Sequence, residues 1–278
     1  MRYAEILRVL MEEPLLLMPA AHASLARLFA EHRSLEALEF RAKREGVDVC
    51  GEAVELAQME VLEGVAVIPL GGPVGVGLGK FEKGAGAVDL GDVAEDLRAA
   101  NADPGVRSIL LDIDSPGGMV SGTLELADRV MMSEKPVYAF TGGMMASAAY
   151  WIGCSAERVF ATKSAEVGGI GVYTLFLDSS RALEAEGRRL EVVASGPYKG
   201  LGVPGTALSE RQRSFLQARV DGIAAMFQGH VSERRGGRVD LEDMQGQSFL
   251  GEEARGRGLV DAVVMDLEEA LEEVRRES

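Results

Sequence analysis

The sequence predicts an α/β protein in which parallel strands are joined by crossover helices. Between residues 65 and 161, short apolar runs alternate with segments of helical spacing, and this order favours parallel strands in one sheet. Glycine-rich turns follow two of these runs, at Ser115–Gly118 and Thr141–Gly143. Because 47% of the 278 residues are hydrophobic, the chain can bury a sizeable core.

The first part of the body supplies most of the expected elements. Strands are expected at 65–70, 108–113, 137–140, 158–161 and 169–175, and helices at 90–100, 120–132 and 145–152. The last of these helices would be buried, because it consists of small and apolar residues.

The second part begins with a strand-like run at 190–194 and continues with a long helix. Ser209-Glu-Arg-Gln212 has the form of a capping box, and the helix that follows has one apolar stripe, formed by Leu216, Val220, Ile223 and Phe227. A short helix and strand are expected at 251–264, and an acidic amphipathic helix at 266–278.

Residues 1–60 differ from the rest, since they are polar and have helical spacing without a sheet pattern. They predict a helical N-terminal arm that packs on the body or on a neighbouring subunit. The body would then comprise residues 61–278.

Composition limits the classes of function. The formal net charge of −15 argues against nucleic-acid binding; it serves solubility or a preference for basic protein substrates. Cys50 and Cys154 are too few for a disulfide framework or a zinc site. No apolar run approaches the ~18 residues of a membrane helix, and charges in residues 1–18 argue against a signal peptide. We therefore expect a cytoplasmic protein without a membrane anchor or a metal.

Two glycine-rich turns are candidates for chemistry. At Ser115–Gly118, glycines allow close approach of a ligand, and amides at a helix start can hold developing negative charge. A plain turn is the alternative. At Gly142–Tyr150, Ser147 stands among small residues, and the amide after it could donate to an oxyanion. The alternative is a buried serine bonded to the preceding turn.

A serine nucleophile needs a base, and the histidines offer none nearby. His22 and His32 lie in the predicted arm, and His230 lies late on the long helix. A lysine whose pKa is lowered by burial can serve instead. Lys199, in the defined loop 194–200, is the best candidate, ahead of Lys80, Lys83 and Lys163, although an arbitrary lysine is usually a surface charge.

Five motifs, in this order, give the chain a specific resemblance over residues 64–264. They are Leu111-Asp-Ile-Asp-Ser-Pro-Gly-Gly118, Ala146-Ser-Ala-Ala-Tyr150, Gly168-Gly-Ile-Gly-Val172, Gly196-Pro-Tyr-Lys199 and Gly251-Glu-Glu-Ala-Arg-Gly-Arg-Gly-Leu-Val-Asp261. The sequence resembles the signal peptide peptidase A family, in particular its soluble branch of phage prohead proteases.

The resemblance implies a ClpP/crotonase-like fold and a serine endopeptidase that forms an acyl-enzyme. It makes Ser147 the nucleophile and Lys199 the base, with oxyanion donors at Gly118, beside Gly117, and at Ala148. It further implies homo-oligomers, polypeptide substrates that include phage capsid or scaffold proteins, a place in the cytoplasm or a phage procapsid, and no metal or cofactor. Met144 and Met145 would line a pocket for small or aliphatic side chains, or simply fill the core.

Three departures from the family pattern bear on function. Gly169 stands where relatives commonly have a serine that orients the lysine. We also expect no membrane anchor, which favours a cytoplasmic or capsid role over signal-peptide clearance. As a third departure, we expect no scaffolding extension of the kind that prohead proteases often carry. Gly169 motivates one alternative, a catalytically degenerate assembly protein. A crotonase-type acyl-CoA enzyme is the other, with Asp112 and Asp114 as its carboxylates.

Overall fold

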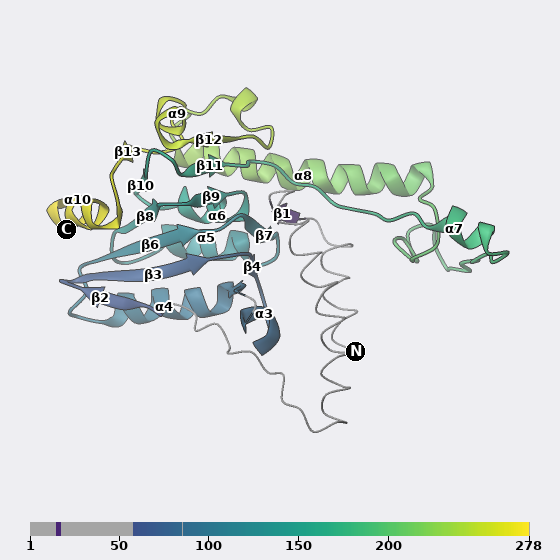
Figure 1. Ribbon diagram of the computed structural model, residues 1–278, viewed down its shortest axis with the longest axis horizontal. Coiled ribbons are helices and arrows are strands. Elements are labelled where there is room, and N and C mark those ends of the chain that lie inside the picture. Colours follow the sequence, from purple (N-terminus) through teal and green to yellow (C-terminus); the bar gives the residue numbers. More distant parts are fainter. Residues whose placement is uncertain (1–14, 18–57, 85, 278) are drawn as a thin grey trace, which may run out of the picture.

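The computed structural model describes residues 15–17, 58–84 and 86–277 (Figure 1). Its centre is a six-stranded sheet of order β13-β10-β8-β6-β3-β2, in which every neighbouring pair is parallel except β2 with β3. The strands are β2 (Glu60–Leu62), β3 (Val65–Gly71), β6 (Ser108–Asp114), β8 (Val137–Thr141), β10 (Arg158–Ala161) and β13 (Ala262–Val263). The predicted α/β fold is confirmed.

Helices cover both faces of this sheet. The crossover helices α4 (Leu90–Ala102), α5 (Thr123–Met131) and α6 (Ala148–Gly153) bury their apolar residues in one core, together with Ile109, Leu111 and Ile113 of β6. Leu110 points the other way, as strand alternation requires, into a second core covered by α10 (Leu267–Glu277). The predicted terminal helix is therefore confirmed.

Two small sheets lie where β6 and β8 end. One has the order β1-β7-β4-β5 and the other the order β12-β11-β9. Their strands are β1 (Leu15–Leu17), β4 (Val74–Gly75), β5 (Val88–Asp89), β7 (Gly117–Met119), β9 (Met144–Ala146), β11 (Glu166–Gly168) and β12 (Ser248–Leu250). The remaining short helices are α3 (Lys80–Gly84), η1 (Leu241–Asp243) and α9 (Gly251–Gly256).

A long extension projects from this body (Figure 1). It contains α7 (Ser180–Ala185) and the first turns of α8 (Glu210–Arg234). The predicted capping box is confirmed, because Ser209 Oγ accepts from the Gln212 amide (3.3 Å) while Gln212 Oε1 accepts from the Ser209 amide (3.0 Å). Only Phe227 and Val231 of α8 are buried, so the helix is anchored by its C-terminal half.

Three sequence-based expectations were wrong in detail. The buried helix begins at Ala148 rather than at 145, because Met145 pairs with Val167 as part of β9. No strand forms at 169–175: β11 ends at Gly168. Residues 190–194 form no strand, because in the exposed extension no neighbouring strand pairs with them.

The predicted arm falls mostly outside the described residues, which leave out 1–14 and 18–57. Leu15–Leu17 form a strand, and Glu60 already belongs to the main sheet. None of the helices in the described part of the chain combines the length and apolar character of a membrane span.

Candidate active site

The glycine turn and Ser147 meet at the carboxyl ends of β6 and β8. Ser115, directly after β6, forms a parallel bridge with Met145 of β9. The Ser115 amide donates to the Met144 carbonyl (2.7 Å), and the Ala146 amide donates to the Ser115 carbonyl (3.1 Å). The two chain segments therefore run side by side, and the carboxyl ends of parallel strands are where open α/β sheets bind ligands.

The backbone of Ser147 is strained. Its φ of 59° and ψ of −121° lie in a region that costs a non-glycine residue about 1–3 kcal/mol, and among the described residues the only other non-glycine with positive φ is Glu63. The turn is fixed because the Ser147 amide donates to the Gly168 carbonyl (2.8 Å) and the Ser147 carbonyl accepts from the Trp151 amide (2.9 Å). A serine on a strained strand-to-helix turn is the arrangement that presents the nucleophile in α/β-hydrolases.

The turn at Gly117 and Gly118 requires glycine at both positions. Gly117 has a φ of 96°, and its amide donates to Ser115 Oγ (3.2 Å). A Cβ on Gly118 would lie 1.9 Å from the Val74 carbonyl oxygen. The Gly117 amide is therefore already engaged by Ser115, and Ala148, the third predicted oxyanion residue, is the first residue of α6.

Asp114, which the sequence analysis considered only as a carboxylate of the acyl-CoA alternative, holds the backbone beside the site. Its Oδ1 accepts from the Met144 amide (3.0 Å), so it holds the turn that leads into β9. The signal was the motif around Ser115, in which Asp114 ends the strand. Burial, and secondarily the charge of Asp114, raises the pKa of Asp112.

The two methionines of β9 differ in their exposure to solvent. Met145 has no exposed surface, and its Sδ lies 2.4 Å from the point that a Cβ on Gly153 would occupy; it is therefore a core residue. Met144 is partly exposed, and of the pair only Met144 offers surface that a substrate could contact.

Lys199 lies in the extension, away from Ser147. It is exposed and closes a turn in which its amide donates to the Gly196 carbonyl (3.1 Å). Its neighbour Tyr198 packs on Phe215 in the first turns of α8, with ring centroids 4.7 Å apart.

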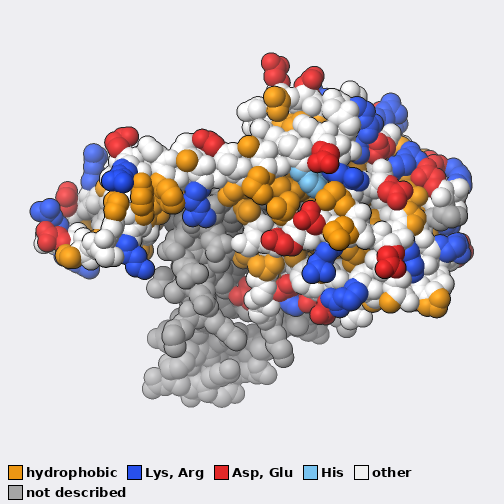
Figure 2. Space-filling view, turned by 180° about the vertical axis from the view of Figure 1, so that it is seen from behind, with side chains coloured by type: hydrophobic (Ala, Val, Ile, Leu, Met, Phe, Trp, Pro, Cys, Tyr) orange, Lys and Arg blue, Asp and Glu red, His pale blue; other side chains and the backbone are white. Residues whose placement is uncertain are grey.

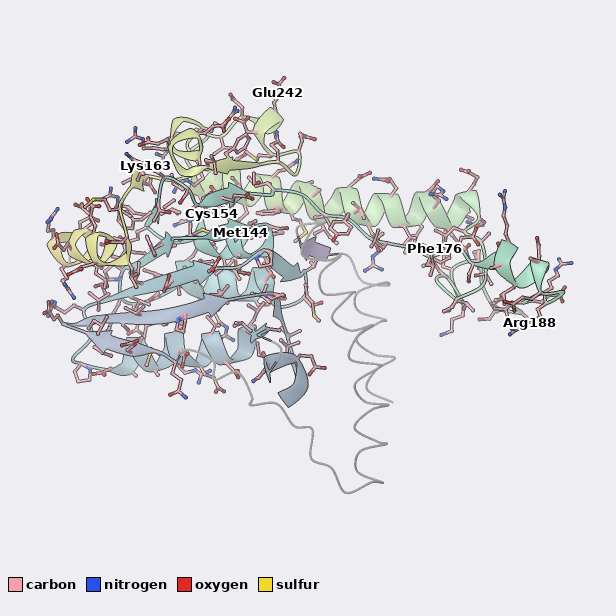
Figure 3. All side chains as sticks on the ribbon, viewed as in Figure 1. Met144, Cys154, Lys163, Phe176, Arg188 and Glu242 are labelled. Atoms are coloured by element: carbon pink, nitrogen blue, oxygen red, sulfur yellow. The ribbon has the colours of Figure 1, made fainter. Side chains whose placement is uncertain are left out.

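The body lies at the other end of α8, where Phe227 stacks on Trp151 at 4.4 Å. Phe215 and Phe227 are about 18 Å apart along the helix axis at 1.5 Å per residue, farther than a lysine side chain reaches. Figure 3 labels Met144 in the body and Arg188 near the far end of the extension. A single chain therefore does not bring Lys199 to Ser147.

Other groups near α6 take structural roles. His230 Nε2 lies 2.8 Å from Ser155 Oγ, which gives this histidine a partner other than Ser147. Burial raises the pKa of the Cys154 thiol to about 12, as expected of a core cysteine. Within the described ranges, no three His, Cys, Asp or Glu residues gather as metal ligands would.

Comparison with known proteins agrees with this geometry. Residues 129–278 match the profile of peptidase family S49, and residues 90–167 match that of Clp protease. Capsid assembly protease C of Escherichia phage lambda is 33% identical over 208 residues, covering 74% of this chain and 47% of that protein. A putative signal peptide peptidase SppA of Enterococcus faecium is 28% identical, covering 65% and 54%.

Two further proteins, one relative and one solved structure, are also similar to this chain. A putative protease of Methanocaldococcus jannaschii is 30% identical, covering 63% of this chain and 57% of that protein. A solved ClpP1 of Listeria monocytogenes has a TM-score of 0.48 at 14% identity, covering 73% of this chain and 92% of that one. The chain thus spans about half the length of the curated relatives it matches. The matched profiles, together with the parallel sheet, confirm the ClpP-like fold and the expected resemblance, and the chain belongs to peptidase family S49.

Proposed function

We propose that this protein is a serine endopeptidase that uses a dyad of Ser147 and Lys199, with two copies of the chain contributing to each site. The observation that carries the proposal is the strained Ser147 backbone (φ 59°), held beside the glycine turn. Such strain persists only where the surrounding structure enforces it, and it clusters at active sites.

The proposed chemistry runs through an acyl-enzyme. The neutral Lys199 amine takes the proton of Ser147 Oγ as Oγ bonds to the peptide carbonyl carbon. The amides of Gly118 and Ala148 stabilise the oxyanion. The lysine ammonium then gives its proton to the leaving nitrogen as the C–N bond breaks, and water hydrolyses the ester by the reverse sequence of proton transfers.

A second copy of the chain would deliver the lysine. The extension that carries Lys199 has exposed apolar side chains, including Leu177, Val193 at 98% exposure and Phe215. Figure 2 shows such side chains along the extension and where it joins the body. Exposed apolar side chains that gather on one part of a protein favour an interaction site there. Contact with a neighbouring subunit would cover these side chains and would place Lys199 beside the Ser147 of that subunit.

We further propose polypeptide substrates, including capsid or scaffold proteins of a phage, and action in the cytoplasm or inside a procapsid. This part rests on relatives such as the lambda capsid assembly protease. A catalytically degenerate assembly protein is the second candidate, and Gly169 favours it. Gly169 lies next to Gly168, whose carbonyl accepts a hydrogen bond from the Ser147 amide. Because Gly169 has no side chain, it offers no hydroxyl to orient a lysine.

Subunit complementation tests the proposal. Ser147→Ala and Lys199→Ala chains, each inactive alone, are co-expressed with different tags, and mixed oligomers are assayed with a peptide substrate. If the dyad spans two chains, random mixing restores about a quarter of the wild-type sites, because each site draws its two groups from two independent copies.

Two different results would contradict two different parts of the proposal. Mixed oligomers without any activity would contradict a dyad shared between copies. Wild-type cleavage by the Ser147→Ala chain alone would contradict the nucleophile, since removing such a residue costs on the order of 10⁶-fold in a well-studied triad enzyme.

A further inference from the structure

We infer that residues 15–17 occupy the strand position that the acyl side of a substrate takes in the proposed site, so that the chain blocks the edge of β7 to which a substrate would bind. The inference rests on the proposed function for the identity of the catalytic groups. The observation that supports it is the pairing of β1. This strand pairs antiparallel with β7, the strand that contains Gly117 and Gly118. Figure 1 shows β1 in purple beside β7.

The polarity of β1 matches that of a substrate. β7 runs away from the Ser115 turn, so Gly117 is its end nearest the turn and Met119 its far end. In the antiparallel pairing, Leu15 lies opposite Met119 and Leu17 opposite Gly117. The carboxyl end of β1 therefore leads toward the turn beside Ser147. An acyl donor must enter in this direction, because its N-terminal residues trail away from the carbonyl that is attacked.

The position of β1 also prevents a second peptide strand from pairing with β7. β7 has β4 on its other side, where Val74 pairs with Gly118. A strand has two edges, and in this sheet β1 covers the second one. An extended peptide can add to a sheet only at a free edge. A polypeptide substrate can therefore pair with β7 only after β1 leaves.

A binding experiment tests this without requiring catalysis. The full chain carrying Ser147→Ala is titrated with a fluorescent peptide of the sequence of residues 12–20, Glu-Glu-Pro-Leu-Leu-Leu-Met-Pro-Ala. A second protein also carries Leu16→Pro, which removes a backbone donor and disfavours strand pairing. The matched control carries Leu16→Val, which keeps an apolar, strand-compatible residue.

We expect the Leu16→Pro protein to bind the peptide at least about tenfold more tightly than the Leu16→Val protein, the factor that corresponds to β1 occupying the edge of β7 about 90% of the time. A peptide with proline at the position of Leu16 should bind neither protein. Equal affinities of the two proteins for the natural-sequence peptide, or failure of both to bind it, would overturn the inference.

An activity assay separates this outcome from the proposed function. With Ser147 present, Leu16→Pro should cleave an extended peptide faster than Leu16→Val, whereas a small serine-directed acylating inhibitor should label both. Labelling of both at Ser147 with equal peptide cleavage refutes self-occlusion and leaves the serine peptidase intact. Absence of labelling despite tighter peptide binding by Leu16→Pro refutes the nucleophile and leaves the occupied strand intact.

Discussion

Replacing Ser147 with glycine should stabilise the protein while abolishing its activity. Ser147 adopts φ 59° and ψ −121°, a conformation that glycine reaches without a Cβ clash. The side chain is 2% exposed and makes no hydrogen bond to the backbone of its own helix start. Removing it should therefore cost little, and removing its strain should be the dominant effect.

The magnitude follows from a comparison with Ser147→Ala. Both variants lack the hydroxyl, but alanine keeps the strained Cβ. Relief of strain contributes about 1–3 kcal/mol, and the greater freedom of glycine in the unfolded chain costs about 0.5–1 kcal/mol. Ser147→Gly should therefore exceed Ser147→Ala in free energy of unfolding by about 1 kcal/mol, and by no more than about 2.5 kcal/mol. The melting temperature should be higher by a few degrees.

Thermal and urea unfolding at equal protein concentrations measure this difference. Ala149→Gly, in the regular part of α6, is the matched control and should lower stability, because glycine weakens a helix interior. If Ser147→Gly is no more stable than Ser147→Ala, the backbone at this turn is not strained, and the main argument for its catalytic role is lost.

Three further predictions concern the base, its orientation and the core. Lys199→Met should abolish peptidase activity while Lys163→Met retains it, because only Lys199 is proposed as the base; equal peptide cleavage by the two variants would contradict that role. Gly169→Ser should raise the acylation rate with a serine-directed inhibitor, at a stability cost of about 1–2 kcal/mol for the positive φ of 63°; unchanged or slower acylation in a folded variant would contradict it. Asp261→Asn should lower the free energy of unfolding by about 3 kcal/mol, because Arg235, bonded to Asp261 at 2.8 Å, would be left as a buried charge. Burial alone would raise the pKa of Asp261, but the hydrogen bond and charge of Arg235 hold it below its ordinary value, so this stabilisation should be lost as pH falls below about 4 in wild type and the variant should show no such loss.

The sequence by itself determined the order of the main elements and the identity of the candidate nucleophile. Strands such as Val65–Leu70 and Ser108–Ile113 were predictable because their apolar runs are short and end at glycine turns, and the helix after Ser209 was predictable because a capping box is local. Such signals require only residues close in the chain. The motifs around Ser115 and Ser147 identified the turns for the same reason.

Only the tertiary structure decided how these parts are arranged. The backbone conformation of Ser147 is unfavourable for a serine. It is imposed by hydrogen bonds to residues distant in sequence, such as the bond to the Gly168 carbonyl. The place of Lys199 follows from the length of α8 and the position of its anchor at Phe227, and the pairing of Leu16 with Gly118 joins residues about a hundred positions apart. Local periodicity carries no information on such pairings, because register and distance are set by which surfaces meet when the whole chain packs.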